Sequence, residues 1–236
     1  MTNHVLLRNV EHKDLKILPG RGAHFGDQMM MCSTFPAEFR DLQNHYPIVL
    51  RATGDAQRYE PVVLFGFQDH ENLFVGDDSW DATYVPMCVT RQPFLMGLAG
   101  DNLMVYVDLD HPKVSTTLGD PLFLEFGGNT ETLERVNSTL LAIHHGLQSN
   151  IGFIATLIEL DLIETFVLDS ELTDGSLNRR AGFSCIHEEK FAALDGAALA
   201  RLHQSGYLMA ICMMLASMGK LRDLIERKNR RNDVQG

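Results

Sequence analysis

Short apolar or alternating runs fill the first half of the chain, and Gly, Pro, Asn and Asp separate them. This pattern is typical of antiparallel β-structure, because half-buried strands alternate apolar and polar positions and tight turns favour those four residues. The runs follow one another too closely for the helical crossovers that a parallel sheet needs. The clearest predicted strands are 46–51, 61–67, 103–108 and 122–126, and weaker candidates are 4–8, 15–18, 29–35 and 84–89.

Helical periodicity replaces this pattern after residue 128. Apolar positions from Leu133 to Leu147 recur every three or four residues, so they predict a helix, and Asn129 is expected to cap its first turn. A second helical run is expected at about 151–163. The second half is therefore mainly helical.

A β-hairpin is predicted inside this helical half. Residues 166–172 and 179–186 are strand-like and flank Asp174-Gly175, a pair that accepts the positive φ angles of a tight hairpin turn. The helices expected after it are a turn at 188–193, a helix that Asp195 opens and Ser205-Gly206 interrupts, and one final helix with apolar positions from Leu208 to Ile225.

Together these elements predict an α+β fold, with an antiparallel β-rich N-terminal half and a helical C-terminal half that contains one β-hairpin. A chain of 236 residues, of which 45% are hydrophobic, can bury an ample core without disulfides or a structural metal. No low-complexity linker divides the chain. We therefore expect a single domain over 1–236, with a β-rich part at 1–128 and a mainly helical part at 129–236.

The net charge of −11 argues against a general nucleic-acid surface, because negative charge repels phosphate backbones. Basic residues nevertheless gather at the C-terminus. They are expected to complement the negative end of the last helix and to remain solvated in a frayed tail, and the alternative is an anionic partner. These residues are Lys220, Arg222, Arg227, Lys228, Arg230 and Arg231.

Cysteine spacing and hydropathy indicate a soluble protein of the cytoplasm. The four cysteines form no CxxC pair, so free thiols are expected rather than a zinc or redox motif. The N-terminus lacks the continuous apolar run of a signal peptide. Every apolar stretch also falls short of the ~20 residues that span a bilayer. The four thiols belong to Cys32, Cys88, Cys185 and Cys212.

Several longer segments carry a resemblance to a known family. They are PAEFRDLQNHYPIVL at 36–50, VLFGF at 63–67, WDATYVP at 80–86, RQPFLMG at 91–97, and IHEEKFAALDG, LHQSGYL and LASMGKLRDLIERKN in the C-terminal part. Over nearly the whole chain, these segments resemble the bacterial SapC family. The resemblance implies an association with surface-layer proteins, and relatives that neighbour TonB-dependent receptors and flavin-dependent halogenase-like proteins in Gram-negative genomes. It supplies no set of catalytic residues.

The best catalytic candidate in the sequence is His45. Phe39 and Leu42 share one face of a short predicted helix that Pro47 must end, and His45 and Tyr46 lie between this helix and the next strand. Side chains at such junctions often line pockets, and histidine titrates near neutral pH, so His45 is a candidate general base. The alternative is structural, with the His45 ring bonded to backbone and Tyr46 packed in the sheet.

Arg91 is the best ligand-binding candidate. Its guanidinium can grip a carboxylate with two parallel N–H groups, or stack on the ring of Trp80 or Tyr84. Tyr46 completes the set of expected ligand-binding residues. No stretch matches a nucleotide-binding loop, a zinc-ligand pair or a nucleophile elbow.

No metal or cofactor is expected. An iron site on a β-scaffold needs two histidines and a carboxylate, but no well-placed distal histidine accompanies His12 and Asp14. The acidic loop of Asp77, Asp78 and Asp81 lacks the glycine and the terminal glutamate of a calcium-binding EF-hand loop.

The leading functional hypothesis is a non-catalytic accessory or binding protein that engages a peptide or protein partner, linked to cell-surface or TonB-dependent uptake systems. The final helix and the segment from Trp80 to Phe94 are expected to contact the partner. One alternative is an enzyme that modifies a small molecule or peptide with His45 and Arg91. Another is a structural protein of the surface layer. The sequence leaves the oligomeric state open.

Overall fold

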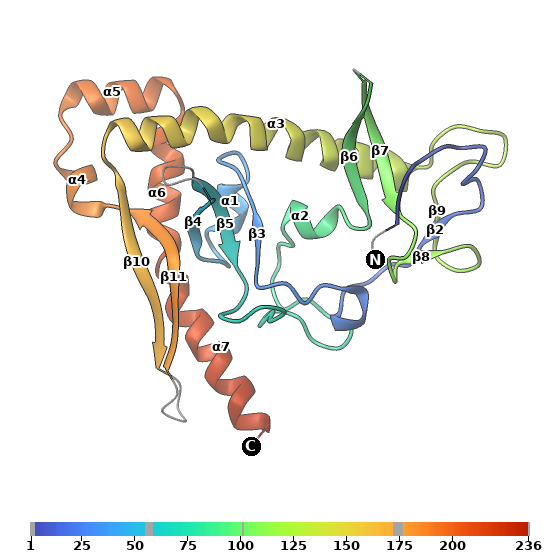
Figure 1. The fold of residues 1–236 in the computed structure, drawn as a ribbon, viewed down its shortest axis with the longest axis horizontal. Coiled ribbons are helices and arrows are strands. Elements are labelled where there is room, and N and C mark those ends of the chain that lie inside the picture. Colours follow the sequence, from blue (N-terminus) through green and yellow to red (C-terminus); the bar gives the residue numbers. More distant parts are fainter. Residues whose placement is uncertain (1–2, 55–58, 101, 172–176, 236) are drawn as a thin grey trace. The chain divides into compact units, whose positions relative to one another are not determined.

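The computed structural model describes residues 3–54, 59–100, 102–171 and 177–235, which form two units (Figure 1). The first unit comprises Met1–Gln28, Val75–Asp81 and Met87–His145, and the second comprises Met29–Phe74, Ala82–Pro86 and Gly146–Gly236. Both units combine antiparallel strands with helical segments, which confirms the predicted α+β class. The single domain over 1–236 stays a prediction.

Two small antiparallel sheets build the first unit. One has the order β1-β7-β6 and contains β1 (His4–Leu6), β6 (Phe94–Ala99) and β7 (Asn102–Asp108). The other has the order β8-β2-β9 and contains β2 (Lys16–Ile17), β8 (Val114–Ser115) and β9 (Asp120–Pro121). Two short helices accompany them, η1 (Ala23–Phe25) and α2 (Met87–Thr90).

The core of the first unit joins its strands to the beginning of α3 (Glu131–Glu159). Phe94 of β6 and Val107 of β7 are buried in one apolar cluster with Leu133 and Leu140 of α3. Figure 1 shows the β6–β7 pair beside this part of the helix. Periodic apolar positions on α3 and inward residues of the strands therefore close a common core.

Two helices were predicted here, one over Leu133 to Leu147 and one at about 151–163. The structure has the single helix α3 instead, and its residues from Gly146 onward belong to the second unit. Ser149 and Asn150 lie in its middle, and their side chains bond without breaking the helix. The Ser149 hydroxyl donates to the carbonyl of Gly146 at 2.6 Å, and Asn150 Nδ2 donates to the carbonyl of Thr34 at 2.9 Å.

The predicted cap of this helix was one residue too early. Thr130, not Asn129, accepts the Leu133 N–H, with its Oγ1 at 3.3 Å. The Thr130 hydroxyl also donates to the carbonyl of Pro121 at 2.8 Å. Asn129 instead forms an isolated β-bridge with Phe123, which keeps it outside the helix.

A five-stranded antiparallel sheet forms the second unit, in the order β10-β11-β4-β5-β3. Its strands β10 and β11 confirm the predicted hairpin arms, while the expected turn at Asp174-Gly175 lies outside the described residues. The strands are β3 (Met31–Ser33), β4 (Ile48–Ala52), β5 (Tyr59–Leu64), β10 (Ile163–Glu171) and β11 (Leu177–Ile186).

Five helices accompany this sheet in the described part of the second unit. They are α1 (Phe39–Leu42), α4 (Glu188–Ala192), α5 (Gly196–Gln204), α6 (Tyr207–Ser217) and α7 (Lys220–Gln235). Helix α6 contacts α1, α5, β4 and β11 (Figure 1). A buried polar link joins helix to strand, because the Ile48 N–H donates to Ser217 Oγ at 2.9 Å. The predicted cap at Asp195 is confirmed by its bond from the Ala198 N–H at 2.8 Å.

Two strand predictions were wrong, and strand β6 was not predicted. Residues 84–89 contain helix α2, which begins directly after Pro86, a residue whose fixed φ suits a helix start. Residues 122–126 turn back at Gly127 and Gly128, where positive φ angles end the extended run after β9. Strand β6 was missed, because Pro93 and Gly97 weaken its strand pattern.

The predicted final helix is two helices, and its basic end is packed rather than solvated. Helix α6 ends at Ser217, and α7 begins at Lys220 after Gly219. Lys228 is 9% exposed and its Nζ lies 2.5 Å from Glu71 Oε1. The Arg231 guanidinium donates to the carbonyl of Asn72 at 2.9 Å. The expectation of a solvated tail was therefore wrong for these two residues.

Candidate functional site

Three predicted site residues, His45, Tyr46 and Tyr84, meet in the second unit. Tyr46 is fully buried, with its ring centroid 4.7 Å from that of Phe74, and its hydroxyl donates to the carbonyl of Tyr84 at 2.5 Å. His45 Nε2 shares a hydrogen bond of 2.8 Å with the Thr83 hydroxyl. These contacts fasten the Thr83-Tyr84 segment to the end of α1.

The Tyr84 hydroxyl is held in a buried polar network. It donates to Glu38 Oε1 at 3.1 Å, and Glu38 Oε2 accepts the Thr34 hydroxyl at 2.7 Å. Burial, and then the nearby Glu38 carboxylate, raises the pKa of Tyr84, so the phenol remains a neutral donor. Ligand binding by Tyr46 and Tyr84 stays a prediction, and both hydroxyls already have protein acceptors.

Trp80 and Arg91 belong to the first unit. Trp80 forms an isolated antiparallel bridge with Val75, which closes the acidic loop between them. Arg91 follows α2, and its Nη1 donates to the carbonyl of Phe94 at 2.7 Å. The structure thus divides the predicted site residues between the units, and Arg91 lines a cavity of the first unit.

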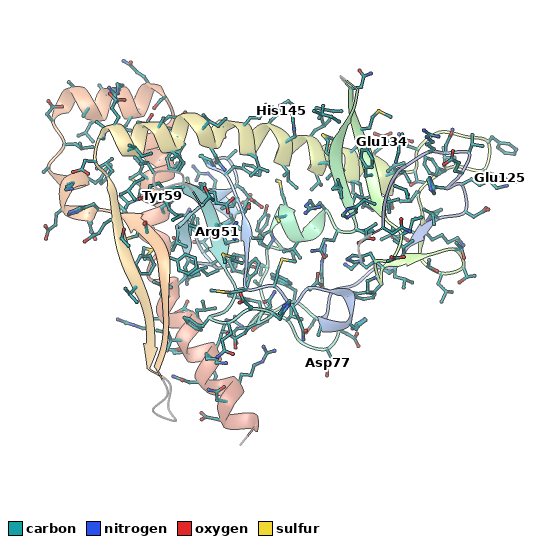
Figure 2. All side chains as sticks on the ribbon, viewed as in Figure 1. Arg51, Tyr59, Asp77, Glu125, Glu134 and His145 are labelled. Atoms are coloured by element: carbon teal, nitrogen blue, oxygen red, sulfur yellow. The ribbon has the colours of Figure 1, made fainter. Side chains whose placement is uncertain are left out.

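This cavity has a volume of about 670 Å³. That size suits a small ligand or the end of a peptide. Its apolar wall contains Ile17, Leu18, Phe94 and Val136, and its basic residues are Arg21, Arg91, Lys113 and Arg135. Figure 2 labels Glu134, an acidic lining residue on α3.

Lys113 is the most deeply buried cation of the cavity. Its residue is 3% exposed, and its Nζ donates to the carbonyl of Gly20 at 2.8 Å and lies 5.2 Å from the centroid of the Phe25 ring. Burial, reinforced by the charge of Arg21 and opposed by Asp27, lowers the pKa of Lys113 to about 8. Its surroundings therefore satisfy the ammonium only in part.

Arg21 is better compensated than Lys113. Its Nη1 donates to the carbonyl of Val89 at 3.2 Å and lies 3.7 Å from Oδ1 of the fully buried Asp27. Asp27 Oδ2 also accepts the Gly22 N–H at 2.9 Å. Burial lowers the pKa of Arg21, and Asp27 opposes that shift. This pair forms a charged but balanced part of the first unit.

The acidic lining residues lie at the exposed rim. The side chain of Glu131 is 90% exposed and stands 4.0 Å from Arg135, itself 68% exposed. Glu134 accepts Asn129 Nδ2 at 2.7 Å. Among the described residues, no carboxylate forms an ion pair with Arg91 or with Lys113. The cavity therefore presents two cations that form no ion pair with a carboxylate in this part of the chain.

Gln92 lines the same cavity, and its side chain carries a buried acceptor without a donor. Gln92 Oε1 is inaccessible to solvent and accepts no hydrogen bond within the described chain. Buried acceptors are normally paired, because a buried acceptor without a donor has lost its hydrogen bonds to water and gained none from the protein. The cavity thus combines two cations that form no ion pair within the described residues with a lining residue whose buried acceptor has no donor.

Sequence reasoning found Arg91 but missed Arg21, Gln92 and Lys113. Lysine is usually exposed, and nothing local distinguishes Lys113 from a surface lysine. The glycines beside Arg21 are a weak signal of close backbone approach. The site forms only when the segments that contain Arg21, Gln92 and Lys113, which are distant in sequence, pack together. Within the described residues, no cluster of three or more His, Cys, Asp or Glu side chains is arranged to hold a metal ion.

Comparison with known proteins identifies a family. Residues 7–224 match the SapC family. No curated protein and no solved structure shows a significant match. Over the described residues, no helix combines the length and the apolar character needed to cross a bilayer. Because the match covers most of the chain, the protein belongs to the SapC family.

Proposed function

We propose that the protein is a binding protein that receives the carboxyl end of a peptide in the cavity of its first unit. Arg91 grips the carboxylate, and Lys113 adds a second positive charge. This role fits an accessory protein that engages a peptide or protein partner. No catalytic step is required of it.

The absence of an ion pair for Arg91 and Lys113 among the described residues carries this proposal. Lys113 is buried and Arg91 is half-buried. A charge removed from water without a partner is unfavourable, so such cations are normally matched by carboxylates. Arg91 uses one N–H group for the Phe94 carbonyl, and a guanidinium has five. A carboxylate from outside would complete the charge balance and accept short, charge-assisted hydrogen bonds.

Gln92 and the apolar wall favour a peptide over an inorganic anion. A peptide carries an N–H group close to its terminal carboxylate, and Gln92 Oε1 is an acceptor next in sequence to Arg91. The last side chain of the peptide would pack against apolar residues such as Phe94 and Val136. Phosphate or sulfate offers neither an N–H donor nor an apolar side chain.

The carboxylate claim predicts a difference between two matched peptides. Acetyl-Ala-Leu should bind the full chain at least tenfold more tightly than its C-terminal amide, because hydrogen bonds to charged groups are worth about 1.5–3 kcal/mol. Arg91→Lys should remove most of this difference, since lysine lacks the planar fork. Isothermal titration calorimetry measures both affinities.

A matched control separates binding from stability. Arg8→Lys changes an exposed arginine of the same unit and should leave both affinities unchanged. Arg91→Lys also loses the bond to the Phe94 carbonyl, so a fall of about 1 kcal/mol in unfolding free energy is expected. Equal binding of acid and amide by the natural protein would refute the carboxylate claim.

Lys113 predicts how binding depends on pH. Because its pKa is about 8 in the folded protein, the ammonium loses its proton as the pH rises above that value. Affinity for acetyl-Ala-Leu should therefore fall severalfold from pH 7 to pH 9. The Lys113→Met variant should bind more weakly at pH 7 and lose most of this pH dependence. A constant affinity across this range would remove Lys113 from the site.

The stability of the ligand-free protein should change in the opposite direction. The folded pKa of Lys113 lies below its usual 10.5, so the unfolded chain holds more protons between these values. Stability should rise with pH above about 8 as the buried charge is lost. The neighbouring Arg21 remains charged, and burial lowers the pKa of His111 below its ordinary value. Denaturant titration of Lys113→Met isolates the contribution of the lysine.

Location and cellular context form part of the proposal. Among the described residues, no disulfide joins the four cysteines, which suits the reducing cytoplasm. The link to uptake systems rests on the family resemblance. Under the binding proposal, His45→Ala leaves peptide affinity unchanged. Turnover of a bound peptide that His45→Ala abolishes would instead favour the enzyme alternative.

A further inference from the structure

A second cavity, of about 710 Å³, lies wholly within the second unit. Its apolar side is the C-terminal half of α3, and its polar side comes from β3, β5 and Thr53, the residue after β4. Figure 2 shows Arg51 and Tyr59 on the neighbouring strands β4 and β5. Tyr59 lines this cavity, which we call the α3 groove.

Aliphatic side chains form a continuous stripe along the α3 groove. They recur at helical spacing and are Leu147, Ile151, Ile154, Ala155 and Ile158. Ile151 is 76% exposed, although isoleucine is normally buried. At 1.5 Å per residue, the stripe extends for roughly 16 Å. The stripe is therefore long enough for an extended aliphatic chain.

An unsatisfied acceptor lies at the polar side of this stripe. Asn150 is 8% exposed, and its Nδ2 donates to the Thr34 carbonyl at 2.9 Å. This bond fixes the amide orientation, because the Thr34 carbonyl can only accept. Asn150 Oδ1 is buried and accepts no hydrogen bond within the described residues. Asn150, a residue that lines the α3 groove, thus keeps one acceptor without a donor.

The charge of the other polar side chains is already compensated. Glu60 forms an ion pair with Arg51, and its second oxygen lies 3.5 Å from the Ser33 hydroxyl. No lysine or arginine lines the α3 groove among the described residues. A carboxylate ligand would therefore meet acceptors without a cation, whereas an uncharged donor would complete the hydrogen bonding of Asn150.

We propose that the α3 groove binds an aliphatic amphiphile whose uncharged head group donates a hydrogen bond, such as a fatty amide. The alkyl chain lies along Ile151, Ile154 and Ile158, and the head group donates to Asn150 Oδ1. A peptide fits less well, because it brings polar backbone groups every ~3.3 Å and the aliphatic stripe offers them no partner.

Three probes of equal chain length test this chemistry with the full protein. Octanamide donates a hydrogen bond, methyl octanoate does not, and octanoate carries a negative charge. By calorimetry, octanamide should bind about five- to tenfold more tightly than the ester, the value of one buried hydrogen bond. Octanoate should bind more weakly than octanamide. Equal binding of amide and ester, or tighter binding of octanoate, would overturn the proposal.

Two variants locate the binding. Ile151→Glu puts a charge on the exposed stripe and should weaken octanamide binding at least tenfold. The matched control Leu141→Glu, at an exposed site on the same helix outside the groove, should have no effect. Asn150→Ala should abolish the preference for amide over ester. This preference is the ratio of two affinities measured on the same variant, so it does not depend on the stability of that variant. An unchanged affinity in Ile151→Glu, or an unchanged ratio in Asn150→Ala, would place the probe elsewhere.

Discussion

Lys228→Met is expected to lower the free energy of unfolding by about 3–5 kcal/mol, because it leaves the buried Glu71 carboxylate without its cation. Both side chains are 11% exposed, and the Lys228 Nζ lies 2.5 Å from Glu71 Oε1. Glu71 Oε2 also accepts the Phe67 N–H at 2.8 Å, so the pair holds α7 to a turn of the second unit. Methionine retains most of the packing volume and isolates the charge. Urea denaturation measures the loss.

Arg230→Met is the matched control on the same helix. Arg230 is 73% exposed and lies 4.0 Å from Glu226, a surface arrangement worth little. Its replacement should change stability by less than about 0.5 kcal/mol. Neutralising both partners, in Lys228→Met with Glu71→Gln, should restore part of the loss. A loss below about 1 kcal/mol in Lys228→Met would show that α7 is not anchored through this pair.

Gly146→Ala is expected to destabilise the protein by about 2 kcal/mol, although alanine is normally the better helix former. A methyl group at Gly146 would lie 2.3 Å from Cγ of the buried Phe35 ring. The ring cannot retreat without disturbing the core. Overpacking therefore outweighs the gain in helix propensity.

Gly152→Ala on the same helix is the control for this prediction. A methyl group there would meet the hydroxyl tip of Tyr207 at 2.7 Å, which a small rotation can move away. This variant should be neutral or stabilise by up to about 1 kcal/mol. Thermal and urea unfolding should thus give opposite signs for the two alanines, and matching effects would contradict the close packing of Phe35 on Gly146.

The sequence predicts elements well where local signals agree. Pro47 and the pair Phe39 and Leu42 define α1 and the strand after it, and both apolar side chains are fully buried. The hairpin arms β10 and β11 follow from their strand pattern. Predictions fail at prolines, because a proline can precede either a helix or a strand. Pro86 begins a helix where a strand was expected, and Pro93 precedes a strand that was missed.

The candidate site is less predictable because its character comes from burial. Arg91 is noticeable through its aromatic neighbours, but Lys113 differs from a surface lysine only in its surroundings. The same holds for Gln92 and Asn150, whose unpaired oxygens emerge only when distant segments pack. The C-terminal basic residues show the reverse case. A charge run that suggests a solvated tail contains Lys228, which forms a buried ion pair.

A crystal structure of the protein with acetyl-Ala-Leu tests the central claim most directly. The account predicts a peptide in the cavity of the first unit, with carboxylate oxygens about 2.7–3.2 Å from the Arg91 guanidinium nitrogens. The leucine N–H should point to Gln92 Oε1. A bound peptide whose carboxylate lies away from Arg91, or an empty cavity at saturating peptide, would contradict it.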